Sequence, residues 1–242
     1  RIEGISGQAT QLSVKDGQLV LTVRDIRAAD VVYWTGEESS DWDYAATEHF
    51  QNSAGDKDIF VTGDQVVFDD AASVSTVNLK QDLDPREVVV RGKKNFTFSG
   101  AGAIVGSANL VKEGTGTLTL QNDNTFTGGV RLSGGVTKVA SLSNAYQSYG
   151  ALGNPGDAAG LFVMENGAEL NTTAAVQTNT PIKLQTAEGG VLNNASDFAM
   201  NAAFSGTRLT KKGAGWLKLY ADNGALDTLT VEAGVLQSNV AT

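Results

Sequence analysis

Two stretches of this chain, residues 110–139 and residues 209–238, read as copies of each other. They align without a gap, and the second starts 99 residues after the first (209 − 110). Each carries Leu-x-Lys-x-Gly-x-Gly-x-Leu-x-Leu, then a turn rich in Asp and Asn, a strand, a glycine turn and a last strand. A strand-and-turn unit that recurs along a chain indicates a solenoid, because each unit buries its apolar side only by stacking on its neighbours.

The positions shared by the two copies are glycines, alternating leucines and one asparagine. They are Gly114, Gly116, Leu118, Leu120, Asn124, Gly213, Gly215, Leu217, Leu219 and Asn223. We expect the glycines to mark tight bends or close backbone approaches and the leucines to share one side of a strand. Neither Gly-x-Gly is a phosphate loop, because no Gly-Lys-Ser/Thr and no helix follows it. The neighbouring charged residues are expected at solvated edges: Lys112, Glu113, Lys211 and Lys212.

Short apolar segments fill the chain before and between the two copies. They lie at residues 64–68, 73–79, 86–91, 95–98, 161–164, 168–170, 182–184 and 191–192. Their alternation, with Gly or Asx between them, is typical of strands. This pattern favours an all-β parallel β-helix with roughly 20–25 residues per coil and on the order of nine coils. Corner asparagines are expected to stack as a ladder: Asn122, Asn124, Asn166, Asn193, Asn194 and Asn223.

The chain divides into a hairpin and a solenoid. Residues 1–30 are predicted to hold a hairpin around Asp16-Gly17, a tight-turn signal, and to be the tail of a preceding domain. Residues 31–242 are predicted to form the β-helix, with residues 31–63 as a cap or first irregular coil and a brief helix at residues 44–51. A first repeat section (64–139), a protruding loop (140–160) and a second repeat section (161–242) follow. Because the sequence starts without a signal pattern, we expect a piece of a longer protein.

Composition argues against several classes of function. The chain has 18 Lys and Arg against 27 Asp and Glu, a formal net charge of −9, and no basic cluster, so nucleic acid is not an expected partner. The absence of cysteine excludes disulfides, zinc–thiolate sites and a cysteine nucleophile. No apolar run approaches the roughly 20 residues of a membrane helix. Neither a cofactor nor a metal is expected, because no calcium-loop pattern is complete.

One group of residues near the N-terminus could carry binding or catalysis. Its members are Trp34, Glu37, Asp41 and Trp42. They combine aromatic rings, on which a sugar could stack, with the two carboxylates that a glycosidase or a sugar-binding cleft needs. The alternative is that both rings cover the end of the core, as terminal coils of solenoids do, while the acids line a solvated loop.

The single histidine, His49, is the other candidate for chemistry. Any Ser-His-Asp site would have to use it, with Ser39, Ser40 or Ser53 as the nucleophile. No nucleophile-elbow motif accompanies these residues. We therefore expect a structural histidine, and no catalytic residue is assigned.

The sequence resembles a known family at several places. Residues 110–129 follow the pattern of the autotransporter-associated β-strand repeat, also called the passenger-associated transport repeat, including Asn-x-Phe-x-Gly-Gly at its end. The segment that precedes this repeat in the family resembles Gly-Asp-Gln-Val-Val-Phe-Asp-Asp at 63–70, Phe-Thr-Phe-Ser-Gly-Ala-Gly at 96–102, and Trp-Thr-Gly at 34–36 with Trp42. The resemblance covers about residues 31–242 and implies a right-handed, single-stranded parallel β-helix. The second copy departs from the pattern, because Gly-Ala-Leu-Asp follows Asn223 in place of Thr-Phe-Thr-Gly.

The resemblance implies a structural role outside the cell. It predicts a passenger or stalk segment of a secreted or surface-displayed bacterial protein, which promotes export across the outer membrane and folds on its exterior side. We expect a monomer that meets the membrane only through a translocator elsewhere in the protein. An adhesin or glycan-binding module is one alternative, using residues 34–43 or 141–156 to bind host or environmental glycans or surface proteins. A carbohydrate-active β-helix enzyme is the other, although no catalytic residues come with the family.

Overall fold

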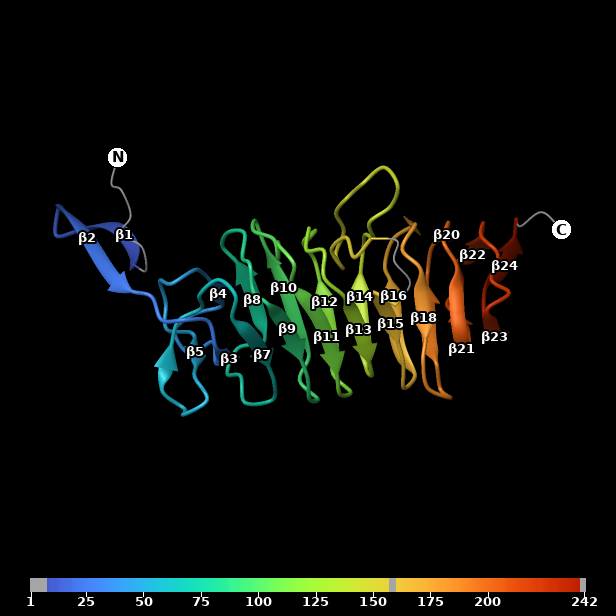
Figure 1. Ribbon diagram of the computed structural model, residues 1–242, viewed down its shortest axis with the longest axis horizontal. Coiled ribbons are helices and arrows are strands. Elements are labelled where there is room, and N and C mark those ends of the chain that lie inside the picture. The colour runs from blue at the N-terminus through green and yellow to red at the C-terminus, as the bar shows by residue number, and fades with distance from the viewer. Residues whose placement is uncertain (1–7, 157–159, 240–242) are drawn as a thin grey trace.

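The computed structural model describes residues 8–156 and 160–239, and every regular element within them is a β-strand. Figure 1 shows the strands side by side along one long axis, with the hairpin at one end and β23 and β24 at the other. Successive coils pair in parallel, so that Val66 lies opposite Val88 and Thr117 opposite Val136. The chain forms a parallel β-solenoid of about 8 turns, which confirms the predicted all-β parallel β-helix.

Three stacks of strands, here called faces A, B and C, form the sides of the solenoid. Face A contains β3 (Val31–Trp34), β7 (Gln65–Phe68), β9 (Glu87–Val90), β11 (Asn109–Glu113), β13 (Val130–Ser133), β15 (Phe162–Met164), β18 (Ile182–Leu184) and the start of β21 (Phe204–Lys212). Face B contains β4 (Asp41–Trp42), β8 (Thr76–Leu79), β10 (Phe96–Gly100), β12 (Thr117–Leu120), β14 (Val136–Val139), β16 (Ala168–Thr172), β19 (Gly190–Asn194), the end of β21 and β23 (Leu226–Val231). Face C contains β17 (Val176–Thr178), β20 (Phe198–Met200), β22 (Trp216–Leu219) and β24 (Val235–Ser238).

The core is a narrow column of inward-pointing apolar side chains. Alternate residues of the strands face it, as the buried–intermediate alternation of β12 and β16 shows. At the N-terminal end the column is aromatic: the ring centroids of Phe68 and Phe98 lie 4.7 Å apart, and those of Trp42 and Phe60 lie 5.4 Å apart at 90°. Tilted and edge-on ring pairs of this kind add to the stabilisation that apolar burial gives.

The N-terminal strands form the expected hairpin. β1 (Gln8–Lys15) pairs antiparallel with β2 (Gln18–Asp25), and the two turn residues have positive φ, 52° at Asp16 and 75° at Gly17. A turn with positive φ at both central residues has a backbone twist that matches the twist of the two flanking strands, which is why it is favoured in two-residue hairpins.

The first coil contains short antiparallel strands and no helix. β5 (Phe50–Gln51) pairs antiparallel with β3 and with β6 (Lys57–Asp58), so the edge of β3 is covered by short antiparallel strands. The helix predicted at residues 44–51 is wrong. Asp43 accepts hydrogen bonds from the backbone N–H and the hydroxyl of Thr47, and Ala45 has φ of +51°, so the chain is held in a turn that helical backbone does not allow.

A loop leaves the stack between β14 and β15. Val130 pairs with Phe162, an advance of 32 residues (162 − 130), whereas Phe162 pairs with Ile182, an advance of 20 (182 − 162). The extra residues rise above the strands in Figure 1 as a loop beside β14 and β16. Its base is anchored, because Leu142, Ala151 and Leu152 are buried in the core.

Candidate functional site

The corner between β11 and β12 is built around a buried lysine. Lys112 is 1% exposed, and its ammonium nitrogen donates to the carbonyls of Glu113 at 2.8 Å, Gly134 at 3.3 Å and Gly114 at 3.5 Å. Desolvation lowers the pKa of Lys112 to about 8, opposed by the charge of Glu113. The predicted position of Lys112 at a solvated edge is wrong, because its aliphatic stem points into the core and backbone carbonyls replace water at its head.

The second copy builds the same corner at the matching positions. Lys211 is 0% exposed, and its ammonium donates to the carbonyls of Lys212 at 2.7 Å, Gly213 at 2.8 Å and Ala233 at 3.1 Å. Each acceptor lies 99 residues after its counterpart in the first copy (for example 233 − 134). The predicted solvated edge is therefore wrong for Lys211 as well, while Glu113 is exposed and Lys212 is half-buried.

Glycines make room for these lysines. Gly135 and Gly234 have positive φ, and a Cβ added at either would lie 2.4 Å from a carbonyl oxygen of the corner below and within 2.8 Å of the lysine nitrogen. A Cβ at Gly114 would meet the carbonyl of Gly92 at 2.4 Å. The backbone of one coil therefore lies directly against the backbone of the adjacent coil at these corners, which is the close backbone approach expected of the glycines. Of the predicted repeat residues, the leucines at 118, 120, 217 and 219 are all buried.

The repeat asparagines tie each coil to the coil before it. Asn124 accepts from the N–H of Ile104 at 2.8 Å, and Asn223 accepts from the N–H of Phe204 at 2.7 Å. In the same way, Asn122 donates to the carbonyl of Gly102. The described corner asparagines that were expected to form a ladder thus bond to backbone groups and to other kinds of side chain, and no hydrogen bond joins two of their side chains.

The two copies lie on different faces, which the sequence alignment does not reveal. Leu110 pairs with Val88 and Val130 on face A, so the first corner joins faces A and B. Leu209 pairs with Gly190 on face B, and Leu217 pairs with Phe198 on face C. The second corner therefore joins faces B and C. The repeat specifies a corner rather than a fixed position in the coil.

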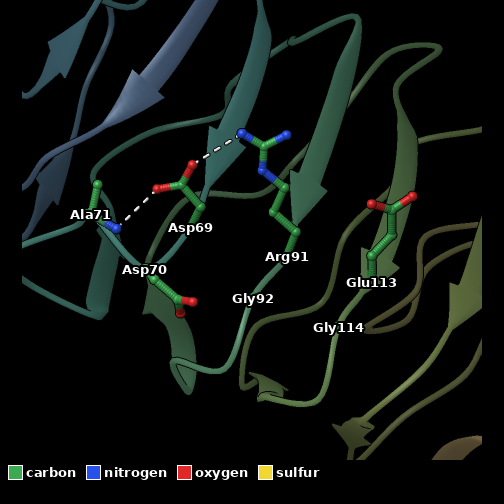
Figure 2. A pocket seen from close by; sticks show the side chains of 7 residues that line it. All are labelled: Asp69, Asp70, Ala71, Arg91, Gly92, Glu113 and Gly114. Atoms are coloured by element: carbon green, nitrogen blue, oxygen red, sulfur yellow. Dashed lines mark hydrogen bonds and ion pairs between the residues drawn. The ribbon is translucent and has the colours of Figure 1, made fainter.

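Beside the first corner lies an open depression of about 530 Å³, lined partly by acidic side chains (Figure 2). Asp69 faces Arg91, with 3.1 Å between the carboxylate and the guanidinium. Asp70 accepts from the N–H groups of Lys94 and Lys93, both at 2.8 Å, and these hydrogen bonds lower the pKa of its carboxyl. Within the described residues, no group of three or more His, Asp or Glu is placed to hold a metal ion. The aspartates thus hold the turns together.

The N-terminal acidic group is dispersed among structural partners. Trp34 and Trp42 are 1% and 0% exposed, so neither ring offers a surface on which a ligand could stack. Glu37 lies 3.6 Å from Lys57. Asp41 accepts from the amide of Asn78 at 2.6 Å, which lowers the pKa of its carboxyl, and lies 3.4 Å from Lys80.

His49 is buried against Trp34, with the ring centroids 5.5 Å apart. Ser39 is the one proposed nucleophile that the structure places beside it, with 3.3 Å between the hydroxyl oxygen and Nε2. The other ring nitrogen, Nδ1, has no hydrogen-bond partner within the described part of the chain, so no carboxylate orients the ring. Desolvation lowers the pKa of His49. A buried, neutral imidazole in the cap fits this arrangement.

Comparison with known proteins identifies the corners. Residues 110–139 and 209–237 match the passenger-associated-transport-repeat family. The chain is also 35% identical over 139 residues to the adhesin BmaC autotransporter of Brucella suis biovar 1 (strain 1330); the match covers 54% of this chain and 4% of that protein. No solved structure matches the chain.

In the described residues, no helix is long and apolar enough to cross a membrane. The two matched segments coincide with the two buried-lysine corners, each with its following glycine turn and strand. The family thus accounts for the features that the two copies share. The chain carries two passenger-associated-transport-repeats, at residues 110–139 and 209–237.

Proposed function

We propose that this chain is a stalk-like passenger segment that promotes export across the outer membrane and folds on the exterior side, secreted or displayed on the cell surface. The observation that carries the proposal is the lysine bridge between coils. Lys112 donates to the carbonyl of Glu113 in its own corner and to the carbonyl of Gly134 in the following coil. Lys211 likewise donates to the carbonyl of Lys212 in its own corner and to that of Ala233 in the following coil. A folded coil therefore presents a lysine whose hydrogen bonds are completed only when the next coil arrives.

This arrangement suits sequential folding. Partners in adjacent coils are close in sequence, for example Thr117 and Val136, so each coil folds on the last without distant segments having to meet. The chain has no cysteine, so no disulfide can form before passage. Folding outside would oppose movement back through the membrane, and the segment would act as a monomer that needs no partner for this step.

The test is surface display of the chain in front of an outer-membrane translocator. Gly135→Val together with Gly234→Val, which block both corners, should reduce the protease-accessible passenger on intact cells several-fold. Thr115→Ala, an exposed residue of the first corner, serves as the control and should display normally. Unchanged display of the double glycine variant, with its folding impaired in vitro, would refute the proposed link between corner formation and export.

Adhesion is a second candidate function, and one observation favours it. The loop at residues 140–156 leaves the stack (Figure 1). Tyr146 lies in its turn between Asn144 and Gln147 and is 92% exposed. A large aromatic side chain with so little burial does nothing for the core, and exposed tyrosines are typical of binding surfaces. The partners proposed for it are host or environmental glycans or surface proteins. A cell-binding assay with Tyr146→Ala tests it, and unchanged binding would reject the loop as the adhesive element.

A further inference from the structure

The loop at residues 140–156 covers a small polar hollow of about 190 Å³. Seven residues line it: Ser143, Asn144, Ala145, Asn154, Gly156, Asn179 and Thr180. The loop supplies five of them, and the turn between β17 and β18 supplies Asn179 and Thr180. Its volume is below the roughly 300–1,000 Å³ of a pocket that encloses a whole drug-sized ligand. It therefore suits one ring of a longer molecule that continues along the surface.

Two hydrogen bonds fix the wall of the hollow and use only the oxygen atoms of two asparagine side chains. The N–H of Ala145 donates to the Oδ1 atom of Asn179 at 3.0 Å, and the N–H of Tyr146 donates to the Oδ1 atom of Asn144 at 2.9 Å. Both carboxamides therefore keep their NH₂ groups for a ligand.

Three further lining side chains add unused donors and acceptors. The side-chain amide of Asn154 and the hydroxyls of Ser143 and Thr180 have no hydrogen-bond partner among the described residues. Ser143 and Thr180 are only 4% and 5% exposed, respectively, and both line the hollow. A ligand that hydrogen-bonds to polar groups left unused by the protein gains both affinity and specificity.

The base of the loop is fixed by contacts with the solenoid. Asn124, fully buried below it, exchanges backbone hydrogen bonds with Gly150 at 2.8 and 3.1 Å and donates from its side chain to Ala151 at 2.7 Å. Gly153 has φ of +65°, and a Cβ there would meet the carbonyl of Phe126 at 2.5 Å, so the backbone of the two segments is in direct contact. A preorganised loop loses little conformational entropy on binding.

The chemistry of the loop selects the class of ligand. No charged residue occurs between Lys138 and Asp157, although 19% of the chain is charged. The same stretch is rich in Tyr, Ser, Asn and Gly, the residues that paratopes use for rigid aromatic contact and adaptable hydrogen bonding. Two tyrosines of this loop are exposed, Tyr146 by 92% and Tyr149 by 44%. Amides, hydroxyls and aromatic rings without charge match the hydroxyl groups and apolar faces of a neutral sugar.

We propose that this hollow and the two tyrosines form a binding site for a neutral saccharide. One sugar ring occupies the hollow, hydrogen-bonded to Asn154 and Thr180, and a neighbouring ring of the glycan lies on Tyr146. This inference rests on the proposed adhesive function and names its ligand class.

The test is a glycan array probed with the folded chain, followed by titration of the neutral glycan that binds. Tyr146→Ala, Asn154→Ala and Thr180→Val should each weaken binding about tenfold, the effect of losing one stacking contact or one hydrogen bond to a ligand. None of these three side chains makes a hydrogen bond that anchors the loop, so the variants should still fold. Circular dichroism of each variant checks this. Tyr220→Ala is the matched control, because Tyr220 is 49% exposed elsewhere on the solenoid.

The outcomes separate this site from the broader functions. Binding of no neutral glycan, or equal weakening by the control and the three variants, would overturn the saccharide site. Cell binding that is lost with Tyr146→Ala in the absence of any glycan binding would leave adhesion standing and point to a protein partner instead. Neither result bears on export, since the display experiment uses variants in the corners and no glycan.

Discussion

The two repeats form the same hydrogen-bond network in two different surroundings. In residues 110–139 the corner lies mid-stack and joins faces A and B, whereas in residues 209–238 it lies at the end of the described stack and joins faces B and C. Leu132 is 0% exposed, but its counterpart Val231 is 41% exposed. The comparison shows that the repeat sequence forms the same corner network on either pair of faces, while the burial of its flanking strands depends on the coils on either side.

When the same substitution is made in both copies, the largest difference should appear at the glycines that follow each lysine. Gly135→Ala adds a Cβ 2.4 Å from the carbonyl of Gly116 at positive φ, and we expect a loss of about 3 kcal/mol. Gly234→Ala makes the same clash, but its exposed strands can shift, so about 1 kcal/mol is expected. Urea unfolding followed by circular dichroism measures both. Equal losses would mean that the last coil is as rigid as the middle of the stack.

Substituting the lysines should have the opposite ranking, with the larger loss of stability in the second copy. The three hydrogen bonds of Lys211 span 2.7–3.1 Å, whereas two of the three made by Lys112 exceed 3.2 Å. Lys211→Met should therefore cost about 2 kcal/mol and Lys112→Met about 1 kcal/mol at neutral pH, because buried carbonyls are left unpaired. Lys183→Met, an exposed strand position, controls for the loss of charge. A larger effect at Lys112 would show that the hydrogen-bond distances do not decide how much each lysine contributes to stability.

Much of the fold follows from the sequence, and the failures are physical. The short alternating segments of the sequence predicted the positions of most strands of faces A and B to within a few residues. The alternation is visible because one side of each strand must be apolar to face the core. The strands of face C at Val176–Thr178 and Phe198–Met200 were missed, since Val-Gln-Thr carries a single apolar residue and Phe-Ala-Met has no polar residue with which to alternate. The helix at residues 44–51 was wrong because the Asp43–Thr47 hydrogen bonds overrode local propensity.

The candidate sites were less predictable from the sequence. A lysine is normally exposed, and only the carbonyls around it explain why Lys112 and Lys211 are buried. Their recurrence two residues before a Gly-x-Gly in both copies was the available signal. The unused polar groups under the loop come from two separate segments, residues 143–156 and 179–180. No spacing in the sequence brings those segments together, so the hollow could be recognised only in three dimensions.

The pH dependence of stability should mark the buried lysine of the first copy. Burial lowers the pKa of Lys112 from 10.5 to about 8, so between these values the unfolded chain binds more protons than the folded chain. The free energy of unfolding of the native chain, relative to Lys112→Met, should therefore rise between pH 8 and 10.5, by on the order of 1 kcal/mol. Urea titrations across this range measure it. A flat difference would mean that the carbonyls keep Lys112 as basic as a lysine in water.

The smallest effect concerns the aromatic residue that the second copy lacks. Phe126 is 1% exposed in the first copy, and Ala225, its counterpart, is exposed. Ala225→Phe should change the free energy of unfolding by less than about 0.5 kcal/mol, because no described coil covers that position and the ring would stay in water. Phe126→Ala provides the contrast, with an expected loss of about 3–5 kcal/mol. If Ala225→Phe stabilised the chain by 1 kcal/mol or more, the end coil would be able to cover an aromatic ring without a further coil. The burial of this position would then be set by the repeat sequence and not by the position of the repeat in the stack.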